Sequence, residues 1–131
     1  MKKDRILNPM IIEAIATLGH TQTICIADCG LPIPKGVRVI DVSVVKGIPT
    51  FLDVLTHVSS ELVIESYVIA SETETNSPNI SEGVKDALSG IPYKTVSHSD
   101  FKKLTEEASC IIRTGEATPY ANIILIGGVN F

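Results

Sequence analysis

Residues 23–34 read Thr-Ile-Cys-Ile-Ala-Asp-Cys-Gly-Leu-Pro-Ile-Pro, a nearly all-apolar run that passes directly into a loop. A strand that is covered on both faces of a sheet is typically apolar throughout, whereas a strand with one wet face alternates. Gly30, Pro32 and Pro34 are residues that end strands and shape rigid loops. Thr23–Ala27 is therefore predicted to be a buried strand of a sheet that carries helices on both faces.

Helical and apolar-strand patterns alternate along the rest of the chain. In the first helix, Asn8 suits the cap, Pro9 the first turn and Gly19 the left-handed residue after the end. This alternation predicts one three-layer α/β/α domain over residues 1–131, with a largely parallel sheet. Helices are expected at about 9–18, 50–60, 78–88 and 99–108, strands at 23–27, 37–41, 62–70, 93–96, 109–113 and 122–126, with a polar stretch at 71–77 and a turn at 114–121.

Composition excludes several classes of function. The chain is 44% hydrophobic but only 5% aromatic, so its core must be built from Ile, Val, Leu and Ala. Its net charge is −4 with both signs mixed, which argues against a nucleic-acid partner. No apolar run approaches the roughly 20 residues of a membrane helix. The start, Met1–Asn8, lacks the apolar core of a signal peptide. These features predict a cytoplasmic protein that does not bind a membrane.

The cysteines and glycines indicate neither a metal nor a cofactor. Cys25, Cys29 and Cys110 are odd in number, which argues against a disulfide framework. Their spacing from His20 matches no zinc pattern, and a fourth ligand is missing. The glycines form no phosphate-binding loop, and no nucleophile elbow is present. We expect a protein that works without a bound cofactor.

The closing segment Arg113–Leu125 places a phenol and a carboxamide, Tyr120 and Asn122, two positions apart at the start of a predicted strand. Alternate residues of a strand point the same way, so both side chains are expected to reach one ligand. These groups bind neutral hydroxyls well and strongly charged groups poorly. The pair favours a small polyol or sugar, although the two residues could equally serve only the start of the strand.

Three further residues could act on such a ligand. His20 follows a predicted helix end, and an imidazole exchanges protons near neutral pH. Asp28 directly follows the strand 23–27, and His98 lies between a strand end and a helix start, where sites of parallel sheets gather. Each residue also has a purely structural interpretation. His20 could be a histidine hydrogen-bonded at a helix end, Asp28 could bond to the backbone of its own turn, and His98 could be a surface loop residue. Lys102, one turn beyond His98, could reach the same place but is expected to be a solvated lysine.

Three motifs occur along the chain: Leu-Gly-His at 18–20, Ile-Ala-Asp-x-Gly-Leu-Pro-Ile-Pro at 26–34 and Arg-Thr-Gly-Glu-x-Thr-Pro-Tyr-Ala-Asn at 113–122. Taken together, these motifs resemble those of the D-ribose pyranase family of sugar mutarotases. The resemblance spans the whole chain and implies a cofactor-free isomerase that interconverts the pyranose and furanose forms of free D-ribose. It implies that His20 is the acid/base and that Asp28, His98, Tyr120 and Asn122 hold the sugar. It also implies a homo-oligomer, commonly a decamer of two stacked pentameric rings, with the site between subunits.

Two other functions remain open at this point. An L-fucose mutarotase is the nearest alternative, although the residues of the second and third motifs favour the D-ribose members of the family. A noncatalytic sugar-binding regulatory module is an alternative of another class. Such a module would need Asp28, Tyr120 and Asn122 but no proton-transferring His20.

Overall fold

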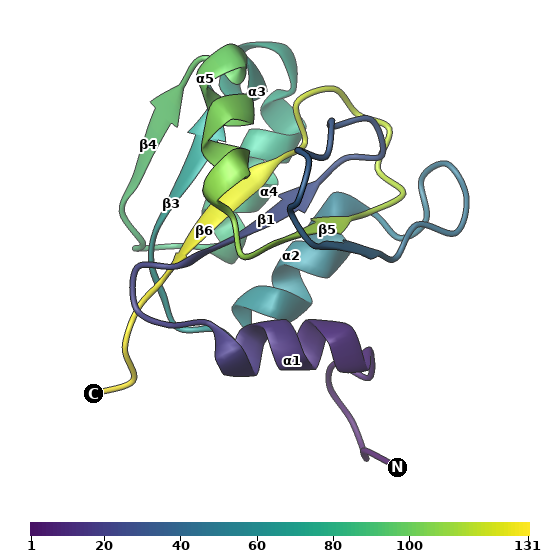
Figure 1. The fold of residues 1–131 in the computed structure, drawn as a ribbon. Helices are drawn as coiled ribbons and strands as arrows, with labels where there is room; N and C mark the ends of the chain where they lie inside the picture. The colour runs from purple at the N-terminus through teal and green to yellow at the C-terminus, as the bar shows by residue number, and fades with distance from the viewer.

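The computed structural model describes residues 1–131 as alternating helices and strands (Figure 1). The helices are α1 (Pro9–Thr17), α2 (Phe51–Ser59), α3 (Ser71–Asn76), α4 (Pro78–Ala87) and α5 (His98–Leu104), which continues into the 3₁₀ turn η1 (Thr105–Glu107). The strands are β1 (Thr23–Ala27), β2 (Val39–Asp41), β3 (Ile64–Ala70), β4 (Tyr93–Val96), β5 (Cys110–Arg113) and β6 (Ile123–Gly127). None of these helices has the length and apolar character needed to cross a bilayer.

The strands form one six-stranded sheet in the order β2-β5-β1-β6-β3-β4. The pairs β2–β5, β5–β1 and β3–β4 are parallel, which confirms the largely parallel sheet. Strand β6 runs antiparallel to both of its neighbours, β1 and β3. A parallel return requires a crossover of about a dozen residues or more. The connection 114–122 from β5 is too short for that, so β6 returns in the opposite direction.

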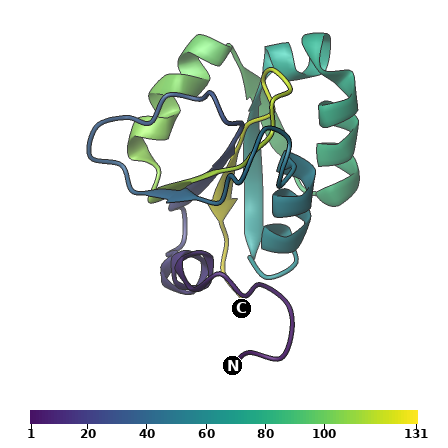
Figure 2. The same cartoon turned by 90° about the vertical axis from the view of Figure 1, so that its right-hand side faces the viewer.

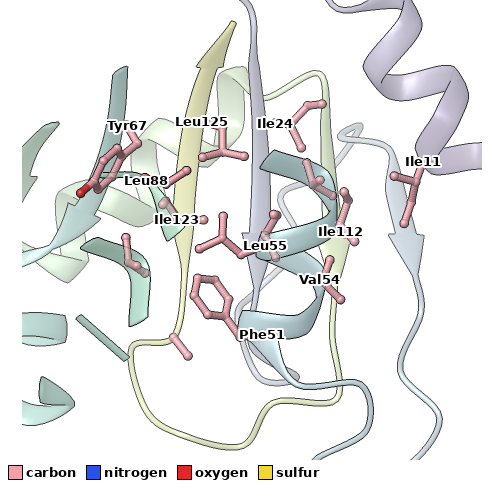
Figure 3. Close-up of a cluster of buried hydrophobic side chains, with 14 of the residues drawn as sticks. Ile11, Ile24, Phe51, Val54, Leu55, Tyr67, Leu88, Ile112, Ile123 and Leu125 are labelled. Atoms are coloured by element: carbon pink, nitrogen blue, oxygen red, sulfur yellow. The ribbon is translucent and has the colours of Figure 1, made fainter. Parts of the chain in front are cut away.

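Helices cover both faces of the sheet, as predicted, with α2 and α4 on one side and α5 on the other (Figure 2). Phe51 and Leu55 of α2 pack with Ile123 and Leu125 of β6 in the larger core cluster (Figure 3). The residue between those two, Ile124, belongs to the smaller cluster under α5. Because successive residues of a strand face opposite sides, both sides of β6 are buried. The sheet is therefore the middle of three layers.

Helix α3 was not predicted, because residues 71–77 were interpreted only as a polar stretch. Its sequence, Ser-Glu-Thr-Glu-Thr-Asn, has no apolar stripe, and Thr73 is its one buried residue. Prediction of a helix rests on such a stripe, so a short polar helix leaves no signal. Its last turn is closed by a helical hydrogen bond, in which the backbone N–H of Ser77 donates to the carbonyl of Thr73.

The predicted left-handed Gly19 is wrong. Helix α1 ends at Thr17, and Leu18 rather than Gly19 is the residue after its end. The side chain of Gln22 accepts a hydrogen bond from the N–H of Gly19 at 2.7 Å. Thr21 takes the left-handed conformation instead, with φ 69°, and its N–H donates to the carbonyl of Gly127. A side-chain bond to the backbone thus shapes the turn that a left-handed glycine was expected to make.

Candidate functional site

Four of the five candidate residues lie at one edge of the sheet, where β1, β3 and β4 end. Asp28 directly follows β1, and His98 directly follows the Ser97 cap of α5 at the end of β4. Asn122 directly precedes β6, which runs the other way, so its amino end reaches the same edge. The reversed strand therefore brings the closing segment, with Tyr120, to the carboxyl edge of β1.

Asp28 and Asn122 form a reciprocal pair at this edge. The amide oxygen of Asn122 accepts from the Asp28 N–H at 2.8 Å, and its Nδ2 donates to Asp28 Oδ2 at 2.9 Å. The N–H of Gly30 donates to the other carboxylate oxygen at 2.9 Å. Asn122 is only 2% exposed, whereas Asp28 is half-buried. The pair holds a carboxylate in a fixed orientation and leaves it with lone pairs for further donors.

Tyr120 does not share a strand face with Asn122, so that prediction is wrong. Strand β6 begins only at Ile123, and Tyr120 lies in the preceding turn with φ 63°. Its carbonyl accepts from the Asn122 N–H at 2.9 Å, which closes the turn tightly. A non-glycine residue rarely takes this left-handed conformation, and such outliers gather at functional sites. The two residues still lie at the same edge of the sheet, but through a turn rather than through strand alternation.

The ring of Tyr120 meets that of His98 edge to face, with ring centroids 5.0 Å apart and an interplanar angle of 82°. On its other side His98 stacks with Phe101, which is completely buried. The Nδ1 atom of His98 is buried and has no hydrogen-bond partner within the chain. Buried polar atoms normally have partners, so this unpaired ring nitrogen is an exception within the fold.

Glu116 fixes the loop that carries Tyr120. Its Oε1 accepts from the N–H of Phe51 at the start of α2, and its Oε2 accepts from both the N–H and the hydroxyl of Thr118. Its backbone carbonyl accepts from the N–H of Cys29. The carboxylate therefore ties the loop to a helix N-terminus, where negative charge is stabilised. No spacing rule connects residues so far apart in the chain.

The same loop passes so close to residues 45–48 that only glycine fits at position 115. A Cβ at Gly115 would lie 2.2 Å from the carbonyl oxygen of Ile48. We expect Gly115→Ala to displace one of the two segments and to lower the free energy of unfolding by about 1–3 kcal/mol. Chemical denaturation measures this loss. Gly30→Ala is the matched control, because its Cβ would meet nothing closer than 3.7 Å. Equal stability of the two variants would contradict the prediction.

His20, the fifth candidate, lies at the opposite edge of the sheet. It precedes β1, whereas Asp28 follows it, so the length of the strand, about 17 Å, separates them. His20 lines an open cavity of about 400 Å³ together with the closing residues 127–131. Within one chain, His20 cannot reach a ligand that Asp28 holds.

A carboxylate at the amino edge orients the imidazole of His20. Glu65 Oε1 lies 3.3 Å from Nε2 of His20, and both side chains are about half exposed. A carboxylate only accepts hydrogen bonds, so Nε2 carries the proton in this contact. The other ring nitrogen, Nδ1, takes no part in this contact.

Comparison with known proteins shows the family of the chain. The model of the RbsD / FucU transport protein family matches residues 1–130. The chain belongs to the RbsD/FucU family. It is similar over its full length to the D-ribose pyranase of Geobacillus thermodenitrificans, with 53% identity and 99% of that protein covered.

Solved structures of RbsD/FucU proteins show the same fold. The chain matches Bacillus subtilis RbsD, solved in complex with D-ribose, at 42% identity with a TM-score of 0.96 and full coverage of both chains. It is also similar in fold to the fucose mutarotase of Streptococcus pneumoniae, at 22% identity and a TM-score of 0.71, over 95% of each chain. The predicted family and fold class are thus confirmed.

The remaining candidate residues of this RbsD/FucU chain have no part in the cluster at the carboxyl edge. Lys102 is exposed on α5. Cys25 and Cys110 are buried, as predicted, and burial raises the pKa of both thiols, that of Cys110 to about 11. Cys29 is exposed. No group of three or more His, Cys, Asp or Glu side chains is arranged to hold a metal ion.

Proposed function

We propose that this chain is a D-ribose pyranase, which interconverts the pyranose and furanose forms of free D-ribose without a cofactor. The observation that carries the proposal is the cluster of hydroxyl-binding groups, Asp28, Tyr120 and Asn122, at one sheet edge. That cluster lies in a chain that is 53% identical over its whole length to a D-ribose pyranase.

The charge of the cluster favours a free sugar over a sugar phosphate. The Asp28 carboxylate accepts hydrogen bonds from neutral hydroxyls but repels an anionic phosphate. Tyr120 and His98 add a phenol and an imidazole beside it. In this proposal Asp28, His98, Tyr120 and Asn122 hold the sugar hydroxyls and fix the orientation of the ring.

The reaction needs only proton transfers. Opening the sugar ring requires a proton on the ring oxygen and loss of a proton from the anomeric hydroxyl, and closure through another hydroxyl reverses both. His20, with Nε2 held by Glu65 and Nδ1 left for the ligand, supplies the acid and base in this proposal. Such general acid–base catalysis contributes about 10²–10⁴-fold in rate.

The separation of His20 from the other four residues implies a site shared between subunits. The amino edge of one chain must meet the carboxyl edge of the next, which is a head-to-tail contact. Head-to-tail contacts close into rings or grow into filaments. Apolar side chains are exposed near both edges, Val44, Val45 and Ile48 beside Gly115 and Phe131 beside His20. We propose the homodecamer of two stacked pentameric rings as the assembly that brings the edges together.

We place the protein in the cytoplasm. Its three cysteines are free, and two of them are buried as thiols. Unpaired cysteines are typical of proteins in a reducing compartment.

Saturation-transfer NMR on purified protein with D-ribose tests the function directly. We expect exchange between pyranose and furanose signals to be accelerated for D-ribose and much less for L-fucose. Acceleration for L-fucose alone would indicate a fucose mutarotase. Ribose binding without acceleration would indicate the noncatalytic module.

Chelation tests whether the reaction is free of a metal. Because the candidate site offers proton-transferring groups and hydroxyl acceptors but no ligand cluster, we expect exchange to be unchanged by EDTA and by reductant. The measurement is the same NMR exchange rate before and after dialysis against the chelator. Loss of activity that one metal restores would overturn the cofactor-free mechanism.

A further inference from the structure

Three side chains of the polar segment 71–77, which comprises α3 and the residue after it, contact the segments that carry His98 and Tyr120. Glu72 Oε2 accepts from the N–H of His98 at 2.6 Å. The hydroxyl of Thr73 donates to the carbonyl of Tyr120 at 2.7 Å, and the hydroxyl of Ser77 donates to that of Pro119 at 2.6 Å. All three bonds end on backbone atoms of the two segments that present the rings.

The bond from Thr73 acts on the strained residue of the site. Thr73 is completely buried, and the Tyr120 carbonyl that it binds also accepts from Asn122 N–H. The left-handed φ of Tyr120 is an unfavourable conformation that persists only where surrounding contacts impose it. Two donors on one carbonyl impose the peptide orientation on the carboxyl side of Tyr120. The direction of the Cα–Cβ bond, from which the phenol ring extends, follows from that backbone.

The hydrogen bond that Glu72 accepts holds the backbone of His98, whose ring contacts that of Tyr120. His98 is the first residue of α5, and its N–H has no partner inside the helix. Glu72 supplies that partner, and its second oxygen accepts from the hydroxyl of Ser71. The hydrogen bonds from Ser71 and from the backbone of His98 lower the pKa of Glu72, so the group acts as a carboxylate. The backbone of His98 is thereby fixed beside Tyr120.

We propose that α3 is the positioning element of the sugar site, with Thr73 setting Tyr120 and Glu72 setting His98. Neither residue touches the sugar in this proposal; each acts through the ring residue whose backbone it holds. Because the edge-to-face contact joins the two rings, loss of either bond is expected to disturb both. The expected effect on the sugar site rests on the proposed ribose activity. The expected effect on the conformations of Tyr120 and His98 does not depend on it.

Thr73→Val removes the hydroxyl and keeps the shape, and Thr73→Ser keeps the hydroxyl. We expect Thr73→Val to raise the KM for ribose about tenfold, through misplaced hydroxyl partners, while the exchange rate at saturating ribose stays within about twofold. Thr73→Ser should restore the KM. Thr105→Val is the matched control, because Thr105 is equally buried and its hydroxyl also donates to a carbonyl, that of Lys102 within the same helical segment.

Glu72→Leu and Glu72→Gln provide an independent second pair, since Gln retains an acceptor for the N–H of His98. We expect a raised KM in the Leu variant and a smaller change in the Gln variant. Crystal structures of the ligand-free variants supply a measurement that needs no sugar: in Thr73→Val, Tyr120 should leave its left-handed φ and the contact with His98 should open.

The outcomes separate the two proposals. A wild-type protein that neither binds ribose nor accelerates its exchange overturns the proposed function, while the ligand-free structures still decide whether Thr73 sets Tyr120. If Tyr120 keeps its conformation in Thr73→Val, the positioning role is wrong. It is also wrong if Thr105→Val raises the KM as much as Thr73→Val, because the effect would then follow from lost stability alone.

Discussion

His20→Ala should abolish the accelerated exchange between ribose forms while leaving ribose binding within about tenfold, or roughly 1.4 kcal/mol. The reason is the division of the candidate residues between two edges of the sheet. The four residues at the carboxyl edge offer hydroxyl partners, whereas His20 at the amino edge offers an imidazole held on one nitrogen by Glu65. Binding by calorimetry and exchange by NMR are measured on the same samples.

Asn122→Ala is the contrasting variant. It removes both hydrogen bonds between Asn122 and Asp28, so we expect weaker ribose binding by about 1–3 kcal/mol. The proton-transferring group is untouched in this variant, and residual exchange at high ribose concentration is expected. Wild-type exchange rates in His20→Ala would show that His20 is not the acid/base, and the noncatalytic module would then be favoured.

Mixing the two defective proteins should restore activity. If a site takes His20 from one subunit and Asn122 from the next, a mixed assembly contains sites in which both residues are intact. Random head-to-tail assembly of equal amounts makes about one quarter of the sites intact. At a ribose concentration well below the KM of Asn122→Ala, where that variant has little activity, we expect the exchange rate of a co-refolded mixture to rise from near zero to about a quarter of the wild-type value.

The control is a mixture in which each protein is first assembled alone and then combined without unfolding. Such a mixture should stay inactive until subunits exchange. Sedimentation of each sample reports whether ring-sized particles are present. A co-refolded mixture that forms these particles but stays inactive would mean that each site lies within one chain, against the shared site proposed here.

The elements with local signals were predictable from the sequence. The run Thr23–Ala27 predicts a doubly covered strand because every residue after Thr23 is apolar. The placement of Asp28 and His98 at one edge followed from parallel strands ending together. The position of His20 could also have been inferred, since His20 precedes and Asp28 follows the same strand.

The sequence did not predict which residues distant along the chain contact each other. Asn122 binds Asp28 across 94 positions only because β6 inserts beside β1, and no local pattern specifies that neighbour. Tyr120 was placed at the start of the last strand, although residues 114–121 were also predicted to be a turn, and no local pattern specified its left-handed conformation. Its conformation is imposed by contacts with Thr73 and Asn122, one of which lies in a helix that carries no apolar stripe.

The antiparallel strand β6 also affects how the protein folds during its synthesis. Strand β6 alone joins the parallel group β2-β5-β1 to the pair β3-β4, and it is the last strand in the chain. During synthesis on the ribosome, the two groups have no shared hydrogen-bonded neighbour until these final residues emerge. Contacts between distant parts of a chain form slowly. The nascent protein must therefore keep two open sheet edges free of other chains until its last strand is made.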